Sequence, residues 1–353
     1  MSTPIATYSA TIDLETILTG RDLSAQAAAD FMTAVIDGRV APATLAAMAI
    51  ALRMKGESAA EIAAFAAIMR KRATRVNAPD CTLDTCGTGG DKSDTFNIST
   101  ATAFVVAGMG IPVAKHGGGS VSSKTGSADV LKALGVCVVA TPARVERCIN
   151  EAGIGFMFAP AFHPGLKHAA AVRKELGVRT IFNLLGPLAS PAAARLQLLG
   201  VYDPALCEKF AEVLKLLGSR CAMIVCGAGP GENGYLDEVS TFGPSTIAWL
   251  KDGAITMEQF HPESLGLARA SGNGLSAADA EASAKIIHAV LNERQKKSPA
   301  RDIVVLNAAA AARVAGRAAE WRDGLRQANE SIDSGRAATA LMKLIAISTE
   351  ETP

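Results

Sequence analysis

Near Cys81 the spacing of apolar residues along the chain changes. Before this point, Ala-rich segments carry apolar residues three and four positions apart, which predicts helices. After it, short β-like runs alternate with helical segments, a pattern typical of a mostly parallel sheet covered by helices. The sequence therefore predicts a small all-helical domain followed by a larger α/β domain.

Start and stop signals delimit the first helices. A helix is expected over residues 24–38, and Pro42 begins another that ends near Gly56. Ser58 and Glu61 have the spacing of a capping box for the next helix. Each of these segments thus has the residue types that begin or end a helix.

The α/β part is expected to contain the following elements. Strands are predicted at residues 82–86, 111–114, 136–140, 154–158, 196–201 and 222–226, and helices at 99–109, 127–134, 142–152 and 204–217. A further helix at 164–176 is a candidate to cross back to the helical domain. A hairpin or meander is expected at 245–261, and helices at 276–293, 302–316 and in the last forty residues.

Charge and hydrophobicity limit the classes of partner. The chain has 353 residues, of which 35 are basic and 34 acidic, so its net charge is +1. Binding to nucleic acid usually needs a basic surface that neutralises phosphates, so we expect no such partner. The longest apolar stretch, residues 101–114, is shorter than the roughly 18 residues of a membrane span, so we expect no membrane association either.

The cysteines and the N-terminus bear on the compartment. Seven cysteines are scattered without a CxxC pair, which is typical of reduced proteins. The first thirty residues lack the basic start and apolar stretch of a secretory signal. We therefore expect a cytoplasmic protein.

The segment at residues 84–102 reads DTCGTGGDKSDTFNISTAT and places three glycines between a predicted strand and a predicted helix. Without side chains there, backbone N–H groups can approach an anion, and the N-terminus of the helix adds partial positive charge. An ordinary glycine-rich turn is the alternative, because short glycine motifs recur by chance. The polar residues that follow favour a phosphate or pyrophosphate site; they are Asp91, Thr95, Asn97, Ser99 and Thr100.

GTGGD followed by TFNIST resembles the substrate-binding loop of the anthranilate phosphoribosyltransferase family. The resemblance continues through KHGGGSVSSKTGSADVLKALG at 115–135, FAPAFHPGLKHAAAVRKELGVRTIFNLLGPLASPA at 158–192 and LDEVS at 236–240. It implies a fold of the nucleoside phosphorylase/phosphoribosyltransferase type. Its helical domain would comprise residues 1–78 with a returning segment at about 163–190, its α/β domain residues 79–162 and 191–353, and the protein would be a homodimer formed through the helical domains.

The resemblance also implies roles for individual residues. Contacts to phosphoribosyl pyrophosphate are implied for Gly87, Gly90, Asp91, Thr95, Asn97, Ile98, Ser99, Thr100, Lys115, His116, Gly117, Gly118, Gly119, Ser120, Val121, Ser122, Ser123 and Ser127. Magnesium, with two ions expected, would be held by Ser99, Asp237 and Glu238, and anthranilate would contact Gly87, Gly118 and Arg173. Taken alone, an Asp-Glu pair more often marks a solvated loop, and Arg173 a solvated helix face.

One departure from the family pattern concerns the loop after Lys115. The family usually has His-Gly-Asn-Arg there, whereas this chain has three glycines at 117–119 after His116. Replacing the asparagine would remove a hydrogen bond to the aromatic acceptor, worth about 0.5 to 1.5 kcal/mol. The additional glycines would also raise the entropy cost of ordering the loop.

The implied reaction is transfer of the phosphoribosyl group to the amine of anthranilate with release of pyrophosphate, a step of tryptophan biosynthesis. Alternatives are another aromatic acceptor, a pyrimidine nucleoside phosphorylase-like enzyme, and a non-catalytic relative that binds nucleic acid. The NIST and SADVL motifs favour the transferase. His163 and His168 lack the spacing of a zinc helix, which excludes a metalloprotease, and the GxSxG and Walker A motifs are absent.

Overall fold

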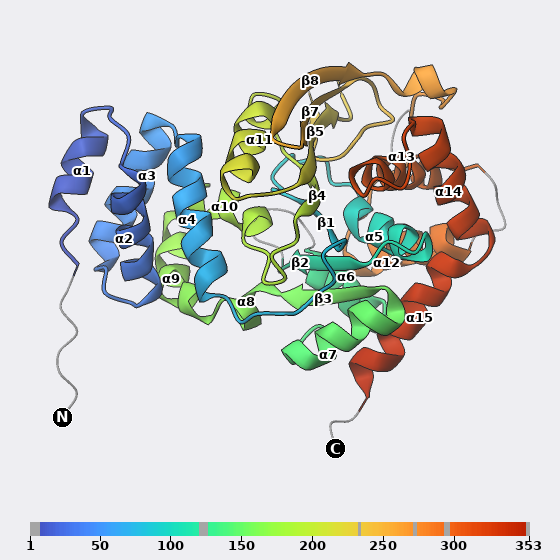
Figure 1. The fold of residues 1–353 in the computed structure, drawn as a ribbon, viewed down its shortest axis with the longest axis horizontal. Coiled ribbons are helices and arrows are strands. Elements are labelled where there is room, and N and C mark those ends of the chain that lie inside the picture. The colour runs from blue at the N-terminus through green and yellow to red at the C-terminus, as the bar shows by residue number, and fades with distance from the viewer. Residues whose placement is uncertain (1–7, 120–125, 232–233, 271–273, 293–296, 351–353) are drawn as a thin grey trace.

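The structure is a computed structural model, which describes residues 8–119, 126–231, 234–270, 274–292 and 297–350. Figure 1 shows a group of helices on one side and a sheet covered by helices on the other. The helical group contains α1 (Thr11–Leu18), α2 (Ala25–Ile36), α3 (Pro42–Lys55), α4 (Ala59–Arg72), α9 (Lys167–Leu176) and α10 (Ile181–Leu185).

The predicted helix signals are present in the structure. The Ser24 side chain accepts a hydrogen bond from the backbone N–H of Ala27 at the start of α2, and Pro42 occupies the first turn of α3. Ser58 and Glu61 form the predicted capping box of α4. Gly56 ends α3 at a φ of +85°, a conformation that glycine adopts without strain.

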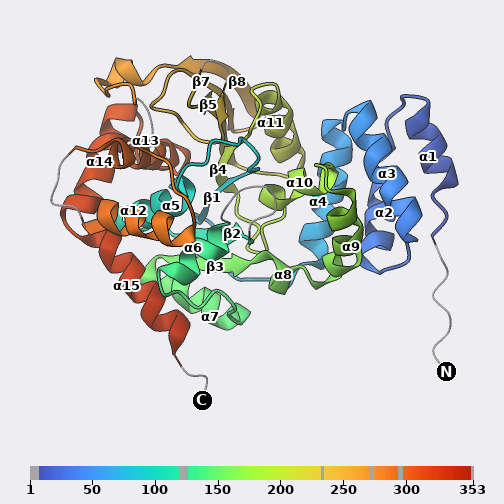
Figure 2. The ribbon, with the colours of Figure 1, turned by 180° about the vertical axis from the view of Figure 1, so that it is seen from behind.

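The segments of the helical group that are distant in sequence pack together. Helix α9 contacts α2 and α3, and α10 contacts α3 and α4. Figure 2 shows the same neighbours from behind. The predicted return of the chain to the helical group is thus seen in these contacts, whereas the exact domain boundaries stay a prediction.

The sheet is mostly parallel, as expected. Its strands are β1 (Leu83–Gly87), β2 (Val113–Gly117), β3 (Ile154–Phe158), β4 (Leu196–Gly200), β5 (Cys221–Ala228), β6 (Tyr235–Leu236), β7 (Ser245–Lys251) and β8 (Ala254–Phe260). The order is β3-β2-β1-β4-β5-β7-β8, and β6 pairs with β5. Pairs from β3 to β5 are parallel, and those involving β6, β7 and β8 are antiparallel. The carboxyl ends of β1, β2 and β4 therefore meet at one edge, where α/β proteins bind ligands.

Helices cover both faces of this sheet. They are α5 (Ile98–Gly108), α6 (Ser127–Ala133), α7 (Pro142–Arg147), α8 (Ala159–Phe162), α11 (Leu206–Leu216), α12 (Ala280–Asn292), α13 (Pro299–Val314), α14 (Trp321–Asp333) and α15 (Arg336–Thr349). A π-helical turn follows α7 at Cys148–Ala152, and short 3-10 turns lie at Pro164–Leu166, Gly186–Leu188 and Pro262–Leu265. Within the described segments, no helix is long and apolar enough to cross a membrane.

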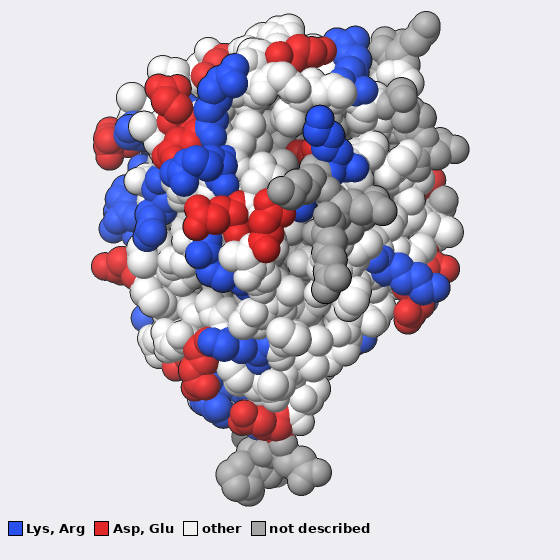
Figure 3. Space-filling model, turned by 90° about the vertical axis from the view of Figure 1, so that its right-hand side faces the viewer, with Lys and Arg blue, Asp and Glu red and all other residues white. Residues whose placement is uncertain are grey.

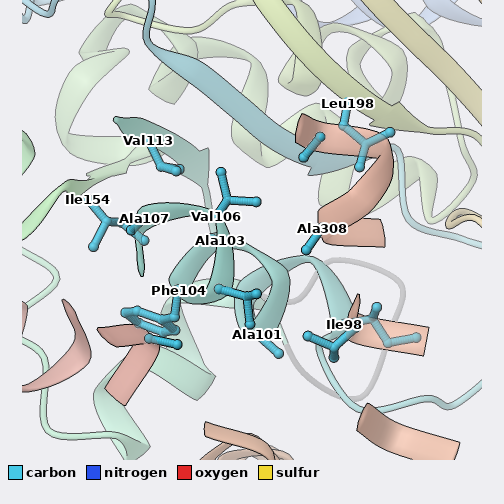
Figure 4. Packing of buried hydrophobic residues seen from close by; sticks show 14 of the residues in the cluster. Ile98, Ala101, Ala103, Phe104, Val106, Ala107, Val113, Ile154, Leu198 and Ala308 are labelled. Carbon is cyan, nitrogen blue, oxygen red and sulfur yellow. The ribbon is translucent and has the colours of Figure 1, made fainter. Parts of the chain in front are cut away.

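Helix α5 is the centre of the main core. All its residues except Ser99 are buried, and it packs against α13 and α15. Figure 4 shows its side chains between the strand residues Val113 and Leu198 and Ala308 of α13. The helix that follows the glycine-rich segment is therefore held firmly, which fixes the position of its N-terminus.

The strand expected at residues 136–140 is wrong. Val136 and Val138 are buried while Cys137 and Val139 are exposed, so the alternation typical of a strand is present. However, the segment pairs with no strand: the N–H of Val136 donates to the carbonyl of Leu131, and that of Cys137 to the hydroxyl of Ser348 in α15. Contact with a helix, rather than with a neighbouring strand, thus produces the same burial pattern.

Candidate active site

A cavity of about 620 Å³ lies where the helical group meets the carboxyl edge of the sheet. Its wall comes from the loops after β1 and β2, from α8 to α10 and from the segment after β6. Met69 of α4 and Arg173 of α9 also line it. Residues of both the helical group and the α/β part therefore line the cavity.

The glycine turn after β1 forms one end of the cavity. Gly90 has a φ of +85°, and its neighbour Gly89 a φ of +61°, so the turn depends on glycine. The N–H of Gly89 donates to Asp237 Oδ2 at 2.8 Å. A Cβ on Gly87 would lie 2.3 Å from the same oxygen, so a larger residue would push the carboxylate away.

The first turn of α5 supplies further polar groups. Asn97 caps the helix, because its Oδ1 accepts the N–H of Thr100 at 3.1 Å. The Ser99 hydroxyl donates to the same Oδ1 at 3.3 Å and accepts a hydrogen bond from Lys115 Nζ at 3.1 Å. Ser99 therefore connects the N-terminus of α5 to β2.

Lys115 is a buried basic residue in the middle of β2. Besides Ser99, its Nζ donates to the carbonyl of Thr85 at 2.6 Å. Burial lowers the pKa of Lys115, and the charges of Asp84, Glu238 and Asp237 act in the opposite direction. A cation held in this way is suited to binding an anion in the cavity.

Asp237 and Glu238 follow β6 and face the same cavity. Burial, with the nearby Asp91 charge, raises the pKa of Asp237 to about 7, and burial raises the pKa of Glu238 well above its usual value. Asp91 Oδ2 accepts the N–H of Asp237 at 3.4 Å. Crowded, half-buried carboxylates of this kind fit a divalent cation, which would offset their charge.

Within the described residues, no three His, Cys, Asp or Glu side chains form a complete metal-binding group. Mg²⁺ is commonly bound by only one or two carboxylates together with phosphate oxygens and water. The pair at 237 and 238, with the Ser99 hydroxyl, matches that incomplete type of site. The residues therefore fit magnesium bound together with a phosphate ligand.

The opposite end of the cavity is more apolar. His116 and His163 lie with ring centroids 5.1 Å apart, and His116 Nδ1 is 3.1 Å from the carbonyl oxygen of Gly186. Burial lowers the pKa of His116 to about 3 and that of His163 to about 4, so both rings are neutral at pH 7. The Arg173 guanidinium lies 5.7 Å from the Phe182 ring centroid. Neutral rings beside a guanidinium suit a flat molecule that carries a carboxylate.

Most residues implied by the sequence resemblance line this cavity. They are Gly87, Gly90, Asp91, Thr95, Asn97, Ile98, Ser99, Lys115, His116, Gly117, Gly118, Gly119, Ser127, Arg173, Asp237 and Glu238. Thr100 is buried inside α5 and does not line the cavity, because the first turn of the helix directs it toward the core. Ser120, Val121, Ser122 and Ser123 lie outside the described residues.

Some residues at the apolar end of the cavity were not predicted from the sequence. His163, Phe182 and Pro187 line the cavity, although only a zinc role was considered for His163. All three lie within the segment 158–192, whose resemblance to the family could have drawn attention to them.

Comparison with known families agrees with this arrangement. Residues 80–338 match the glycosyl transferase family a/b domain, and residues 14–73 match the glycosyl transferase family helical bundle domain. The chain therefore belongs to the glycosyl transferase family that combines a helical bundle with an α/β domain.

Individual relatives narrow the class. The chain is 52% identical to an anthranilate phosphoribosyltransferase of Anaeromyxobacter dehalogenans, over 94% of this chain and 97% of the relative. It is 47% identical to an anthranilate phosphoribosyltransferase of Nitrosomonas europaea, over 96% and 97%. Within its class, the chain belongs to the anthranilate phosphoribosyltransferase family.

Solved structures confirm the predicted fold class. The anthranilate phosphoribosyltransferase of Thermus thermophilus superimposes with a TM-score of 0.87 at 37% identity, covering 96% of this chain and 99% of that one. The enzyme of Saccharomyces cerevisiae, solved in complex with PRPP and Mg, gives a TM-score of 0.84 at 27% identity, covering 95% and 96%.

Proposed function

We propose that this chain transfers the phosphoribosyl group of phosphoribosyl pyrophosphate to the amine of anthranilate, which releases pyrophosphate and gives N-(5-phosphoribosyl)anthranilate. One observation carries the proposal: the glycine turn, Lys115, the acidic pair and Arg173 all line the same cavity. The family membership and the yeast relative solved with PRPP and Mg support it. The product is an intermediate of tryptophan biosynthesis.

The diphosphate is proposed to bind at the polar end of the cavity. The glycine turn and the first turn of α5 offer backbone N–H groups, and Lys115 offers a positive charge. Asp237, Glu238 and Ser99 would hold magnesium beside the phosphates, and two ions are proposed. Bound magnesium neutralises negative charge that develops on the departing pyrophosphate.

The acceptor is proposed to bind at the apolar end. Arg173 would pair with the carboxylate of anthranilate, while the neutral rings of His116 and His163 would contact its ring. This orientation would direct the amine toward the ribose carbon, and such positioning can supply a large part of the rate enhancement. The reaction requires no covalent nucleophile from the chain.

We also propose a homodimer formed through the helical parts. Ile12, Leu18 and Met54 are 82%, 64% and 83% exposed. Leu18 and Met54 lie together with other apolar residues of α1 and α3 in a shallow groove lined by Leu14, Leu18, Ala46, Ala47, Ile50, Ala51 and Met54. A second copy covering this face would remove the exposed apolar area from water.

We also propose that the protein acts in the cytoplasm. Its partners would be small-molecule substrates, and neither nucleic acid nor membranes. The cysteines of the described residues are all free, which suits a reducing compartment. On the face shown in Figure 3, basic and acidic side chains are interspersed, which suits a small charged ligand better than a long polyanion.

A product assay tests the proposed reaction. The purified protein would be incubated with phosphoribosyl pyrophosphate, Mg²⁺ and a panel of aminobenzoates, and we expect anthranilate to be consumed fastest. A parallel incubation with pyrimidine nucleoside and inorganic phosphate tests the phosphorylase alternative. Lack of turnover of every aminobenzoate would contradict the transferase assignment.

The acidic pair gives a second test. The double variant Asp237→Asn, Glu238→Gln keeps the size of both side chains but removes their charges, so we expect turnover to fall by at least about a hundredfold, since metal-bound charge stabilisation is worth several kcal/mol. Its rate should also depend less steeply on the Mg²⁺ concentration. Wild-type turnover in this variant would refute the metal assignment.

A further inference from the structure

Arg179 lies in the connection between α9 and α10 and reaches from the helical group to the glycine turn. Its backbone is attached to the helical group, because Arg53 Nη1 of α3 donates to the carbonyl of Arg179 at 2.8 Å. Its guanidinium extends the other way, to the ring of Tyr202 just after β4, where the centroid is 4.3 Å away. Arg179 thus contacts elements of both parts of the molecule.

The guanidinium also touches the outer side of the glycine turn. Nη2 donates to the carbonyl of Thr88 at 3.3 Å. A Cβ on Gly90 would lie 1.8 Å from Nη1, so the guanidinium occupies the space that any side chain at this position would need. Gly90 is therefore required by the contact with Arg179 as well as by its positive φ.

The inner side of the same turn is tied to the acidic pair. The N–H of Gly89 donates to Asp237 Oδ2, one residue along the turn from the carbonyl that Arg179 holds. A continuous series of contacts therefore runs from the helical group through Arg179 and the turn to Asp237. Arg179 itself does not line the cavity, so it does not contact a ligand bound there and acts from behind the turn.

Two hydrogen-bond donors of the Arg179 guanidinium lack partners among the described residues. Its Nε and Nη1 are buried and, among the residues that the structure describes, have no hydrogen-bond partner. Nor does it form an ion pair within those residues. Burying donors of a charged group without partners costs free energy, so this arrangement is not explained by fold stability.

We propose that Arg179 is a positioning residue that holds the 87–90 glycine turn in its anion-binding conformation and couples that turn to the helical group. This inference deepens the proposed function and rests on it for the identity of the anion. The uncompensated charge beside the turn favours a negatively charged ligand on the other side of it. Magnesium pyrophosphate and magnesium phosphoribosyl pyrophosphate should therefore bind more weakly when Arg179 is replaced.

The experiment compares wild type with Arg179→Met and Arg179→Lys in the full chain. Calorimetry with Mg²⁺ and either pyrophosphate or phosphoribosyl pyrophosphate should show a Kd about tenfold higher for Arg179→Met, the effect of losing one charged hydrogen bond. Arg179→Lys should recover only part of the loss, because lysine lacks the planar group that stacks on Tyr202. Lys174→Met removes an exposed cation from α9 and should leave the Kd unchanged.

Hydrogen exchange supplies a readout that needs no substrate. In the unliganded Arg179→Met variant, amides of residues 88–91 should exchange at least about tenfold faster than in wild type, while α5 keeps its protection. Unchanged exchange in this segment, or an unchanged Kd for both anions, would overturn the inference. So would an equal acceleration across the whole chain, which would mark a general loss of stability.

These results separate the inference from the proposed function. A wild-type protein without turnover of any aminobenzoate would contradict the transferase, yet the exchange of residues 88–91 would still decide the role of Arg179. Conversely, an active wild type with an unaffected Arg179→Met variant would contradict only the inference.

Discussion

At Gly118, the part of the chain that the structure describes leaves room for a side chain. Among the described residues, which exclude 120–125, a Cβ there would meet only the Cβ of Ala159, at a contact distance of 3.9 Å. The next glycine toward β2 is different, because a Cβ on Gly117 would lie 2.1 Å from the hydroxyl of Ser127. Two adjacent glycines of the same loop are thus expected to tolerate substitution very differently.

We predict that Gly118→Asn lowers the KM for anthranilate by about two- to tenfold, the effect of one added hydrogen bond of ordinary strength. The expectation follows from the family pattern and from the free space at this position. Gly117→Asn, the matched control, should lower turnover instead because of its clash with Ser127. Steady-state kinetics of both variants test this, and a higher KM for Gly118→Asn would contradict it.

Burial of His163 makes the stability of the folded protein depend on pH. Its pKa is lowered to about 4 by burial, whereas an unfolded histidine titrates near 6.5. Between these values the unfolded chain binds a proton that the folded chain does not, so stability falls as the pH drops from about 6.5 to 4 and is unaffected above that range. The buried Asp84 and the half-buried Asp237, whose pKa values are raised, act in the opposite direction.

A comparison of variants isolates this contribution. When the pH is lowered from 7 to 5, wild type loses the stability that a neutral His163 contributes, whereas His163→Gln has no such group to lose. The loss in the free energy of unfolding should therefore be smaller for His163→Gln than for wild type, by about 1 to 2 kcal/mol. Urea titrations at both pH values measure the difference. Identical pH dependence of the two proteins would show that His163 titrates normally.

The sequence resemblance pointed to the residues of the polar end and to Arg173 and Gly118, but not to His163, Phe182 and Pro187 at the apolar end. Gly87 lies in a glycine turn whose preference for anions can be read locally, whereas the roles of Lys115 and Asp237 follow from the family motifs in which they stand. The contact between His116 and His163, and the role of Arg179, depend on how α8 to α10 fold over the strand ends. Local patterns carry no information on such contacts, because they join segments that are far apart in the chain.

Among the elements, the start of α4 combines several interactions in one buried side chain. Glu61 is fully buried, and its carboxylate accepts hydrogen bonds from the N–H groups of Ser58 and Leu23 at 2.8 and 2.9 Å. Lys55 Nζ, at the end of α3, donates to it at 2.9 Å. Glu61 therefore joins the ends of α3 and α4 to the segment before α2.

We predict that Glu61→Ala lowers the free energy of unfolding by about 3 kcal/mol, because two backbone N–H groups and a buried ammonium lose their acceptor. The control is Asp22→Ala, which removes an exposed carboxylate that also pairs with Lys55 and should cost less than about 1 kcal/mol. Thermal and urea unfolding measure both. Equal losses for the two variants would contradict the special role of the buried acid.

The elements illustrate what local sequence can specify. The capping box of Ser58 and Glu61 was predicted from its spacing, but the contacts of Glu61 with Leu23 and Lys55 were not. Likewise, residues 136–140 were predicted as a strand and alternate in burial as a strand would, but they contact α15 instead of another strand. Periodicity predicts which side of a segment is buried, but not what covers it.

At the scale of the whole molecule, the exposed face of α1 and α3 makes the proposed dimer testable. Met54→Glu places a charge in the apolar groove, so we expect it to convert a dimer into a monomer in sedimentation experiments. Met342→Glu, on an exposed site of α15, should leave the oligomeric state unchanged. A wild-type monomer, or a dimer insensitive to Met54→Glu, would contradict the proposed interface.

The fold class was predictable from the sequence, and the strand order was not. The change of apolar spacing near Cys81 separates the helical segments from the alternating ones, and the structure confirms that division into element types. The order β3-β2-β1-β4-β5 depends on pairing between strands that are distant in the chain. Each strand is a short apolar run, so nothing within it specifies its neighbour.

The interruption of the helical group has a consequence for synthesis on the ribosome. Helices α1 to α4 emerge first, but α9, α10 and the strands that complete their apolar core emerge only later. At about 5 to 20 residues per second, the nascent chain carries these unfinished helices for roughly ten seconds. During that interval the growing polypeptide exposes apolar surface of the N-terminal helices to water. We therefore expect the nascent chain to depend on chaperones that cover these helices until the strands up to β7 have been synthesised.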